Sequence, residues 1–258
     1  MATLNPAVAQ WIVQLADAGE AVAFNAYQCL QEEVFKAPAE LRGALADALG
    51  KELIAEARTA EGGPASFRGN VFLQAAATER PAPKHPARVR TKLARLLGFV
   101  SHAAAVPYLA KALGDFEARE MARQALESNG SPQAVEALIA ALDSAGPQFR
   151  AGVVNSLGKL RGDKAAAAVR KAAADPQDGI RVAALYALAE FPDPTHDAII
   201  ASPARVGGER KAAHIARVRL AATLRANGNR AEAERVYRAV LSSDAPEAQK
   251  RACRLALG

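Results

Sequence analysis

The chain has 258 residues, of which half are apolar, 5% are aromatic and 23% are charged, and its net charge is +6. Alanine supplies much of the apolar fraction, and runs of valine or isoleucine with a period of two are nearly absent, so we do not expect a β-sheet. Cys29 and Cys253 lie near opposite ends of the chain and predict neither a disulfide framework nor a metal site. The start resembles no signal peptide and no apolar run is long enough to span a membrane, so we expect a cytoplasmic protein.

Residues 1–60 predict three helices that form an N-terminal cap or degenerate repeats. Asn5-Pro6 begins a helix that ends near Asp17, and two further helices are expected at about 20–35 and 38–59. This segment carries the single tryptophan of the chain but no recognisable repeat.

Residues 61–86 predict a connection, because prolines and glycines are frequent there and no helical periodicity is sustained. A short helix near 67–78 is expected inside this otherwise irregular stretch.

Residues 87–203 predict a repeat array. An arginine is followed seven positions later by a leucine, and this pattern occurs four times at nearly equal intervals. Self-similarity at a fixed period is typical of a solenoid. The pairs are Arg90 and Leu97, Arg119 and Leu126, Arg150 and Leu157, and Arg181 and Leu188.

Each of these helices is followed by a turn and a second helix. Apolar residues recur in the second helices at i, i+3 and i+7, which indicates one buried face. The stripe formed by Val106, Leu109 and Leu113 returns as Val135, Leu138 and Leu142. An aspartate follows each second helix, where an acid favours the start of the next helix; these residues are Asp115, Asp143 and Asp175.

The segments EAREMARQALESNGSPQAVEALIAAL and AGVVNSLGKLRGDKAA resemble HEAT repeats. The period is similar to that of the shorter bacterial repeats, which also occur in phycobilin lyases and in planctomycete and verrucomicrobial proteins, and the resemblance covers about residues 86–202. It implies an all-α fold, a right-handed α-solenoid of helix pairs known as an alpha-alpha superhelix. It also implies a ladder of aspartates and arginines between repeats, for which Asp175 and Arg181 have the usual separation of six residues.

If the repeated arginines form such a ladder, their role is to hold neighbouring repeats together. The alternative is that Arg119, Arg150 and Arg181 form a row that binds a ligand. Because their spacing follows the structural repeat, the interpretation as a ladder is favoured. The planar guanidinium group suits such two-pronged contacts, and a lysine would replace it poorly.

Residues 204–258 predict a C-terminal helical cap. The segment RLAATLRANGNRAEAERVYRAVLSSDAPEAQKRACRLALG resembles a tetratricopeptide hairpin. Terminal repeats of a solenoid are often atypical, because they cover its exposed apolar end.

The chain shows no catalytic or cofactor-binding motif. No nucleophile elbow, phosphate-binding loop, zinc-protease motif or dinucleotide fingerprint is present. Four histidines, expected to be ordinary surface or turn residues, have no partner at metal spacing; they are His85, His102, His196 and His214. We therefore predict a protein that is not an enzyme, with no catalytic residue, cofactor or metal.

The charge distribution is the feature with functional content. Residues 80–114 carry seven basic residues and no acidic residue. Arg88, Arg90, Lys92 and Arg95 are therefore candidates for binding a partner, and positions 88, 92 and 95 share one face of a helix. We expect an exposed basic stripe that binds a protein with an acidic surface.

Three classes of function follow from these observations. The leading hypothesis is a non-catalytic scaffold or adaptor that binds another protein through HEAT repeats. The first alternative is a nucleic-acid-binding protein of the DNA-repair type, although aromatic residues for base stacking are few. The second alternative, a lyase-like or chaperone-like accessory protein, rests on the resemblance in fold alone.

Overall fold

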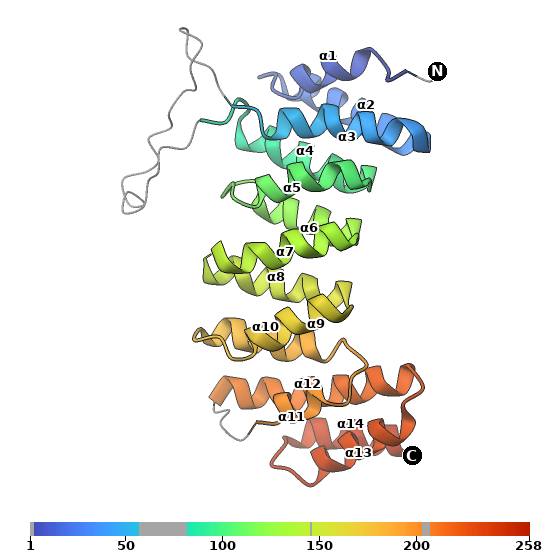
Figure 1. Ribbon diagram of the computed structural model, residues 1–258, viewed down its shortest axis with the longest axis vertical. Coiled ribbons are helices and arrows are strands. Elements are labelled where there is room, and N and C mark those ends of the chain that lie inside the picture. The colour runs from blue at the N-terminus through green and yellow to red at the C-terminus, as the bar shows by residue number, and fades with distance from the viewer. Residues whose placement is uncertain (1–2, 57–81, 145, 203–206) are drawn as a thin grey trace. The chain divides into compact units, whose positions relative to one another are not determined.

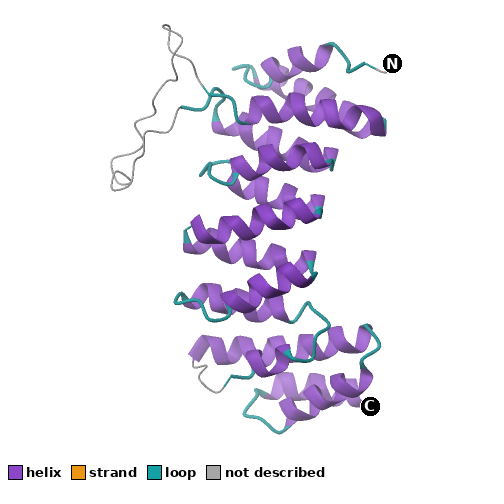
Figure 2. Cartoon of the chain, in the orientation of Figure 1, coloured by secondary structure: helices purple, strands orange, loops and turns teal. Residues whose placement is uncertain are grey.

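The computed structural model describes residues 3–56, 82–144, 146–202 and 207–258. These residues form fourteen α-helices joined by loops and contain no β-strand beyond an isolated bridge between Glu56 and Pro83 (Figure 2). The predicted all-α fold class is confirmed. The predicted connection lies largely outside the described residues, as does the short helix expected near 67–78. None of the described helices combines the length and the apolar character that a membrane span requires.

The chain divides into two compact units, Met1–Ala134 and Val135–Gly258. Unit 1 is blue to green in Figure 1. Its helices form two layers: α2, α4 and α6 pack in succession in one layer, and α1, α3 and α5 pack in succession in the other. The helices are α1 (Ala7–Gln14), α2 (Glu20–Lys36), α3 (Ala39–Leu53), α4 (Ala87–Val100), α5 (Val106–Ala112) and α6 (Arg119–Asn129).

Unit 2 repeats this arrangement with α8, α10 and α12 packed in succession. Helix α9 packs against α8 and α10, α11 packs against α10 and α12, and α13 and α14 follow α12. The helices are α7 (Pro132–Ser144, which begins at the end of unit 1), α8 (Pro147–Leu160), α9 (Asp163–Ala172), α10 (Asp178–Leu188), α11 (His196–Ile200), α12 (Gly207–Ala226), α13 (Arg230–Leu241) and α14 (Glu247–Leu257). The tetratricopeptide character of the last hairpin and the division into four segments stay predictions.

Helix α3 is shorter than expected, because it ends at Leu53 and not at 59. Beyond its end the carbonyl of Ala55 accepts a hydrogen bond of 2.8 Å from the amide of Lys84, and Glu56 forms an isolated bridge with Pro83. The residues that follow α3 therefore pair with the segment that leads into α4.

The repeated leucines form the centre of each unit. Leu97 is 1% exposed, and Leu126, Leu157 and Leu188 are completely buried. Their common phase along the first helices places them all on the buried side of those helices, where apolar burial is the main favourable contribution to folding. The predicted solenoid of helix pairs is confirmed in this respect.

A close helix contact recurs one residue after two of these leucines. A Cβ atom added to Gly98 would lie 3.1 Å from the Cβ of Ala125, and one added to Gly158 would lie 2.8 Å from the Cβ of Ala187. Glycine at these positions lets α4 approach α6 and α8 approach α10 more closely than a larger residue would.

Ladder contacts form in both units, but between partners that the sequence interpretation did not pair. Arg90 donates to Asp115 through Nε at 2.5 Å and through Nη2 at 3.0 Å. Arg150 forms the corresponding ion pair with Asp175. The separation between arginine and aspartate is the same in both cases, so each rung joins a first helix to the start of the next repeat.

Arg181 does not pair with the carboxylate of Asp175 in its own repeat. Its guanidinium group bonds instead to the backbone carbonyl of Asp175 at 2.7 Å and to the carboxylates of Asp178 and Glu209. The carboxylate of Asp175 is engaged by the preceding repeat, which leaves the next rung to Glu209. Arg119 lies over the ring of Phe116, with 4.4 Å from its Cζ to the ring centroid.

Candidate interaction surface

The four basic residues predicted on α4 fall into three different environments. Arg90 does not belong to an exposed stripe, because it is 6% exposed and its guanidinium group is held by Asp115 and by the carbonyl of His85 at 2.6 Å. The correction has a simple cause: Arg90 has the phase of the repeat arginines and points into the interior, whereas positions 88, 92 and 95 lie on the opposite side of the helix.

The rung also affects the titration of Asp115. Burial of this carboxyl opposes its ionisation, but the hydrogen bonds and the positive charge of Arg90 outweigh that effect and leave the pKa of Asp115 below its usual value. The backbone amides of Glu117 and Ala118 also donate to this carboxylate. Asp115 thus both pairs with Arg90 and caps the turn that leads into α6.

Arg88 is exposed and also contributes to the fold. Its Nη2 atom donates to the carbonyl oxygens of Ala16 and Asp17 at 3.1 and 3.0 Å. These carbonyls follow α1, where a cation is favoured by the helix dipole. These hydrogen bonds of Arg88 therefore connect α4 to the end of α1.

Lys92 and Arg95 face outward, together with aromatic residues that the sequence interpretation missed. The Nζ atom of Lys92 lies 5.5 Å from the centroid of the Tyr27 ring. Further along both helices, Phe35 of α2 and Phe99 of α4 place their ring centroids 5.4 Å apart. We refer to Tyr27, Phe35, Lys92, Arg95 and Phe99 together as the α2/α4 surface.

The two contacts between these helices define their direction. Lys92 precedes Phe99 on α4, and their respective partners Tyr27 and Phe35 follow in the same order on α2, so the two helices run side by side in the same direction. Phe35 is 61% exposed and Phe99 is 41% exposed. Exposed aromatic rings beside cations are typical of surfaces that bind other proteins.

The α2/α4 surface carries an excess of positive charge. Two glutamates lie on α2 between Tyr27 and Phe35: Glu32 accepts a hydrogen bond of 2.8 Å from Lys36, and Glu33 accepts one of 3.2 Å from Asn5. The three cations Lys36, Lys92 and Arg95 outnumber these two carboxylates by one charge.

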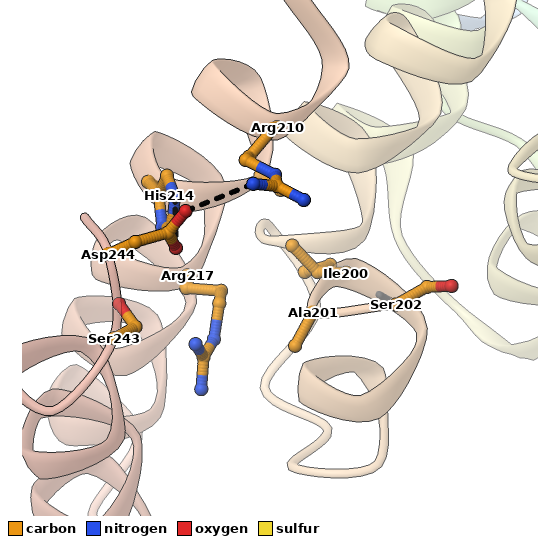
Figure 3. Close-up of a pocket in the computed structure, with 9 residues that line it drawn as sticks. Ile200, Ala201, Ser202, Arg210, His214, Arg217, Ser243 and Asp244 are labelled. Carbon is orange, nitrogen blue, oxygen red and sulfur yellow. Dashed lines mark hydrogen bonds and ion pairs between the residues drawn. The ribbon is translucent and has the colours of Figure 1, made fainter. Parts of the chain in front are cut away.

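Unit 2 contains a pocket of about 260 Å³, which Figure 3 shows in close-up. Arg210, His214 and Arg217 reach it from one face of α12, and Asp244 reaches it from the loop between α13 and α14. Such a cavity with convergent polar groups is a candidate site for a small ligand.

The charged groups of the pocket are engaged with protein partners. Asp244 accepts from Arg210 at 3.2 Å and lies 3.4 Å from the Nε2 atom of His214. Arg217 donates to the buried carboxylate of Asp197 at 2.7 Å. A charged ligand would have to displace these ion pairs, so the pocket is a weaker candidate than the α2/α4 surface.

The histidines differ from the expectation of ordinary surface or turn residues. His102 does lie in a turn, where its Nδ1 atom accepts from the amide of Ala104. His85, His196 and His214 are buried, and burial lowers the pKa of His196. His85 lies 2.6 Å from Glu52, whose pKa is lowered by Lys84 and His85 against the opposing effect of burial.

A metal site does not explain these buried polar residues. Among the residues that the structure describes, no group of three or more histidine, cysteine, aspartate and glutamate side chains could hold a metal ion. Each buried histidine has a contact with an acidic residue, which accounts for its position in the fold.

The stacked helix pairs and the arginine–aspartate rungs define an all-helical repeat protein. Residues 114–189 match the family model described as HEAT repeats. The matched segment extends from the loop before α6 into α10 and includes three of the four repeated arginines.

Solved structures with a similar chain trace come from several kinds of protein. The complex of CpcE and CpcF of phycocyanin lyase from Nostoc sp. PCC7120 is 22% identical, with 99% of this chain and 94% of that chain covered and a TM-score of 0.45. Human deoxyhypusine hydroxylase in complex with glycerol is 17% identical, with coverage of 97% and 94% and a TM-score of 0.33. An engineered protein is 16% identical, with coverage of 96% and 71% and a TM-score of 0.41.

These likenesses carry no information on a substrate or partner of the chain, because the identities and TM-scores are low. No curated protein matches the sequence at a significant level.

Proposed function

We propose that the protein is a non-catalytic scaffold that binds an acidic protein partner through the α2/α4 surface. The single observation that supports this most strongly is the contact of two exposed aromatic rings, Phe35 of α2 and Phe99 of α4, since the outward positions of α4 also carry Lys92 and Arg95. Aromatic residues are enriched at protein interfaces, because a large rigid ring contributes contact area at little cost in conformational entropy.

The repeat architecture supports the same proposal. In a solenoid the interior positions are shared by every repeat, while the outward positions are free to differ from one repeat to the next. Lys92, Arg95 and Phe99 occupy outward positions of α4, so changes there alter recognition with little effect on the fold.

Quantitative affinity capture from a lysate of the source cells tests the proposal. The full chain is compared with Lys92→Glu/Arg95→Glu and with a control variant, Lys171→Glu/Arg251→Glu, which reverses two exposed charges of unit 2. We expect a discrete set of proteins to be lost by the first variant and retained by the control. Capture that is identical for all three proteins would contradict the proposal.

Duplex DNA provides the alternative outcome. Binding to phosphates weakens steeply with salt, because each neutralised phosphate releases counterions. We expect only weak binding that disappears at physiological salt. Tight binding that survives physiological salt and is abolished by Lys92→Glu/Arg95→Glu would instead assign this surface to nucleic acid.

A further inference from the structure

The α2/α4 surface has an internal order: Lys92 lies over Tyr27 at one end, and Phe35 contacts Phe99 at the other. Along α4, Arg95 follows Lys92 by three residues and Phe99 follows it by seven, so all three lie on one face. At a rise of about 1.5 Å per residue, the distance from Lys92 to Phe99 along the helix is about 10 Å.

Helix α2 runs parallel to α4, so its residues lie beside those of α4 in the same order. Tyr27 lies beside Lys92, and Phe35 lies against Phe99. The Lys92–Tyr27 contact and the Phe35–Phe99 contact are therefore separated by about two helical turns on both helices. A partner that matches the surface needs an acidic end and an apolar end at the same separation.

We infer that the α2/α4 surface binds an amphipathic helix with an apolar residue seven positions from an acidic residue on the same face. This inference rests on the proposed function and specifies the partner. The apolar side chain packs on Phe35 and Phe99, and carboxylates pair with Lys92 and Arg95. A second carboxylate three or four residues from the first reaches the other cation, whichever direction the partner helix takes.

A helix fits these constraints better than an extended peptide does. Residues seven apart on one face of a helix are separated by about 10 Å, whereas residues on one face of an extended strand are separated by about 7 or 14 Å. The spacing of charge and aromatic ring on α4 thus equals the spacing that a second helix presents on one face. The exposed aromatic rings provide the apolar contact, and the cations set the orientation of the partner.

The probe for this inference is a fluorescein-labelled helical peptide of about four turns, with two glutamates at i and i+3 and a leucine at i+7. A second peptide has the same composition but carries the leucine on the opposite face. Fluorescence anisotropy at low and physiological salt measures the dissociation constants of both peptides with the full chain. The variants are Lys92→Glu, Phe99→Ser and, as a matched control, Lys171→Glu.

We expect the first peptide to bind at least about tenfold more tightly than the second, and Lys92→Glu and Phe99→Ser each to weaken it about tenfold. The control variant leaves binding unchanged. Circular dichroism and thermal unfolding establish that each variant is folded, and because Lys92 and Phe99 are partly exposed, both variants keep the native fold. Equal affinity for the two peptides, or no effect of Lys92→Glu, would overturn the inference.

Two further measurements separate this inference from the proposed function. If a captured protein depends on the α2/α4 surface but binds through a segment that is not helical, the scaffold stands and the helical partner is wrong. Light scattering detects self-association, and a dimer that Phe99→Ser dissociates would also overturn the inference, because the occupant would then be a second copy of the chain.

Discussion

The helix pair α4 and α6 in unit 1 and the helix pair α8 and α10 in unit 2 share the same buried contacts but differ in their exposed residues. Both have a buried leucine, a glycine that meets an alanine of the next helix, and an arginine that pairs with the aspartate at the start of the next repeat. The outward position two residues after the leucine is Phe99 in unit 1 but Lys159 in unit 2.

The corresponding outward position after the repeat leucine of α10 in unit 2 carries ion pairs. Glu190, two residues after Leu188, accepts from Arg219 at 3.4 Å and lies 3.9 Å from Arg161. Arg219 in turn lies over the ring of Tyr186 at 5.7 Å. In unit 1 the equivalent region exposes Phe35 and Phe99. The repeat therefore fixes the interior residues, whereas the outward residues differ between the two units.

The largest effect is expected for the buried leucines. Leu157→Ala and Leu97→Ala should each lower the free energy of unfolding by about 2–5 kcal/mol, because a large side chain is removed from a packed interior. Urea unfolding followed by circular dichroism measures the change. A loss below about 1 kcal/mol at either position would mean that the two interiors are not equivalent.

Removal of a rung should have the next largest effect. Arg90→Ala leaves the carboxylate of Asp115 without its bidentate partner and should cost about 1.5–3 kcal/mol, as for hydrogen bonds to charged groups. Arg90→Lys keeps the positive charge but cannot bond the carboxylate through two nitrogens of a planar group. We therefore expect it to retain only part of the stability that Arg90→Ala loses. Full stability of Arg90→Ala would show that the rung is dispensable.

Substitution of the contact glycine by alanine should lower stability more at Gly158 of α8 than at Gly98 of α4. Gly158→Ala places a methyl group 2.8 Å from the Cβ and 2.9 Å from the Cα of Ala187, so we expect a loss of about 1–3 kcal/mol. At Gly98 the nearest atoms of Ala125 are 3.1 and 3.2 Å away, and the helix preference of alanine offsets much of the strain. The difference between the two variants, measured by urea unfolding, is the test, and equal losses would contradict the account.

The contribution of Asp115 should depend on pH. Its pKa is lowered in the folded chain, so its contribution to stability is present above the unfolded value of about 3.9 and is lost as the pH falls through the folded value. Asp115→Asn should therefore be less stable than the native chain at neutral pH, and the difference should shrink below about pH 4. A difference that is constant from neutral to acidic pH would contradict the ionised rung.

The smallest effect on stability is expected at the α2/α4 surface. Phe99→Ser removes a ring that is 41% exposed and should cost less than about 1 kcal/mol, in contrast to Leu97→Ala two residues earlier. Thermal unfolding of both variants gives the comparison. If Phe99→Ser were as damaging as Leu97→Ala, the ring would belong to the core and not to a binding surface.

The sequence predicted the features that recur, because periodicity shows which positions face inward. It placed the four leucines correctly and identified the anchor arginines, including Arg90. It did not identify the rung partners, because a contact between one repeat and the next depends on how successive repeats stack. Arg90 was assigned to the surface because a helical wheel of a basic helix does not reveal which cation has an acidic partner.

The aromatic half of the α2/α4 surface could be predicted only in part. Phe99 follows Arg95 by four residues and Lys92 by seven, so its place on the polar face was visible in the sequence. Phe35 was not, because it comes from a helix on the other side of the long connection. The pocket beside α12 was also not predictable, since it combines residues from three separate parts of unit 2.

The most direct test of the binding face is site-specific photo-crosslinking. A photoreactive phenylalanine is placed at Arg95 in unit 1 and, in a second protein, at Asn155, which has the same position two residues before the repeat leucine and is also exposed. After illumination in a lysate of the source cells, we predict discrete crosslinked products for position 95 and none for position 155. Equal crosslinking at the two positions, or products at position 155 alone, would contradict the account.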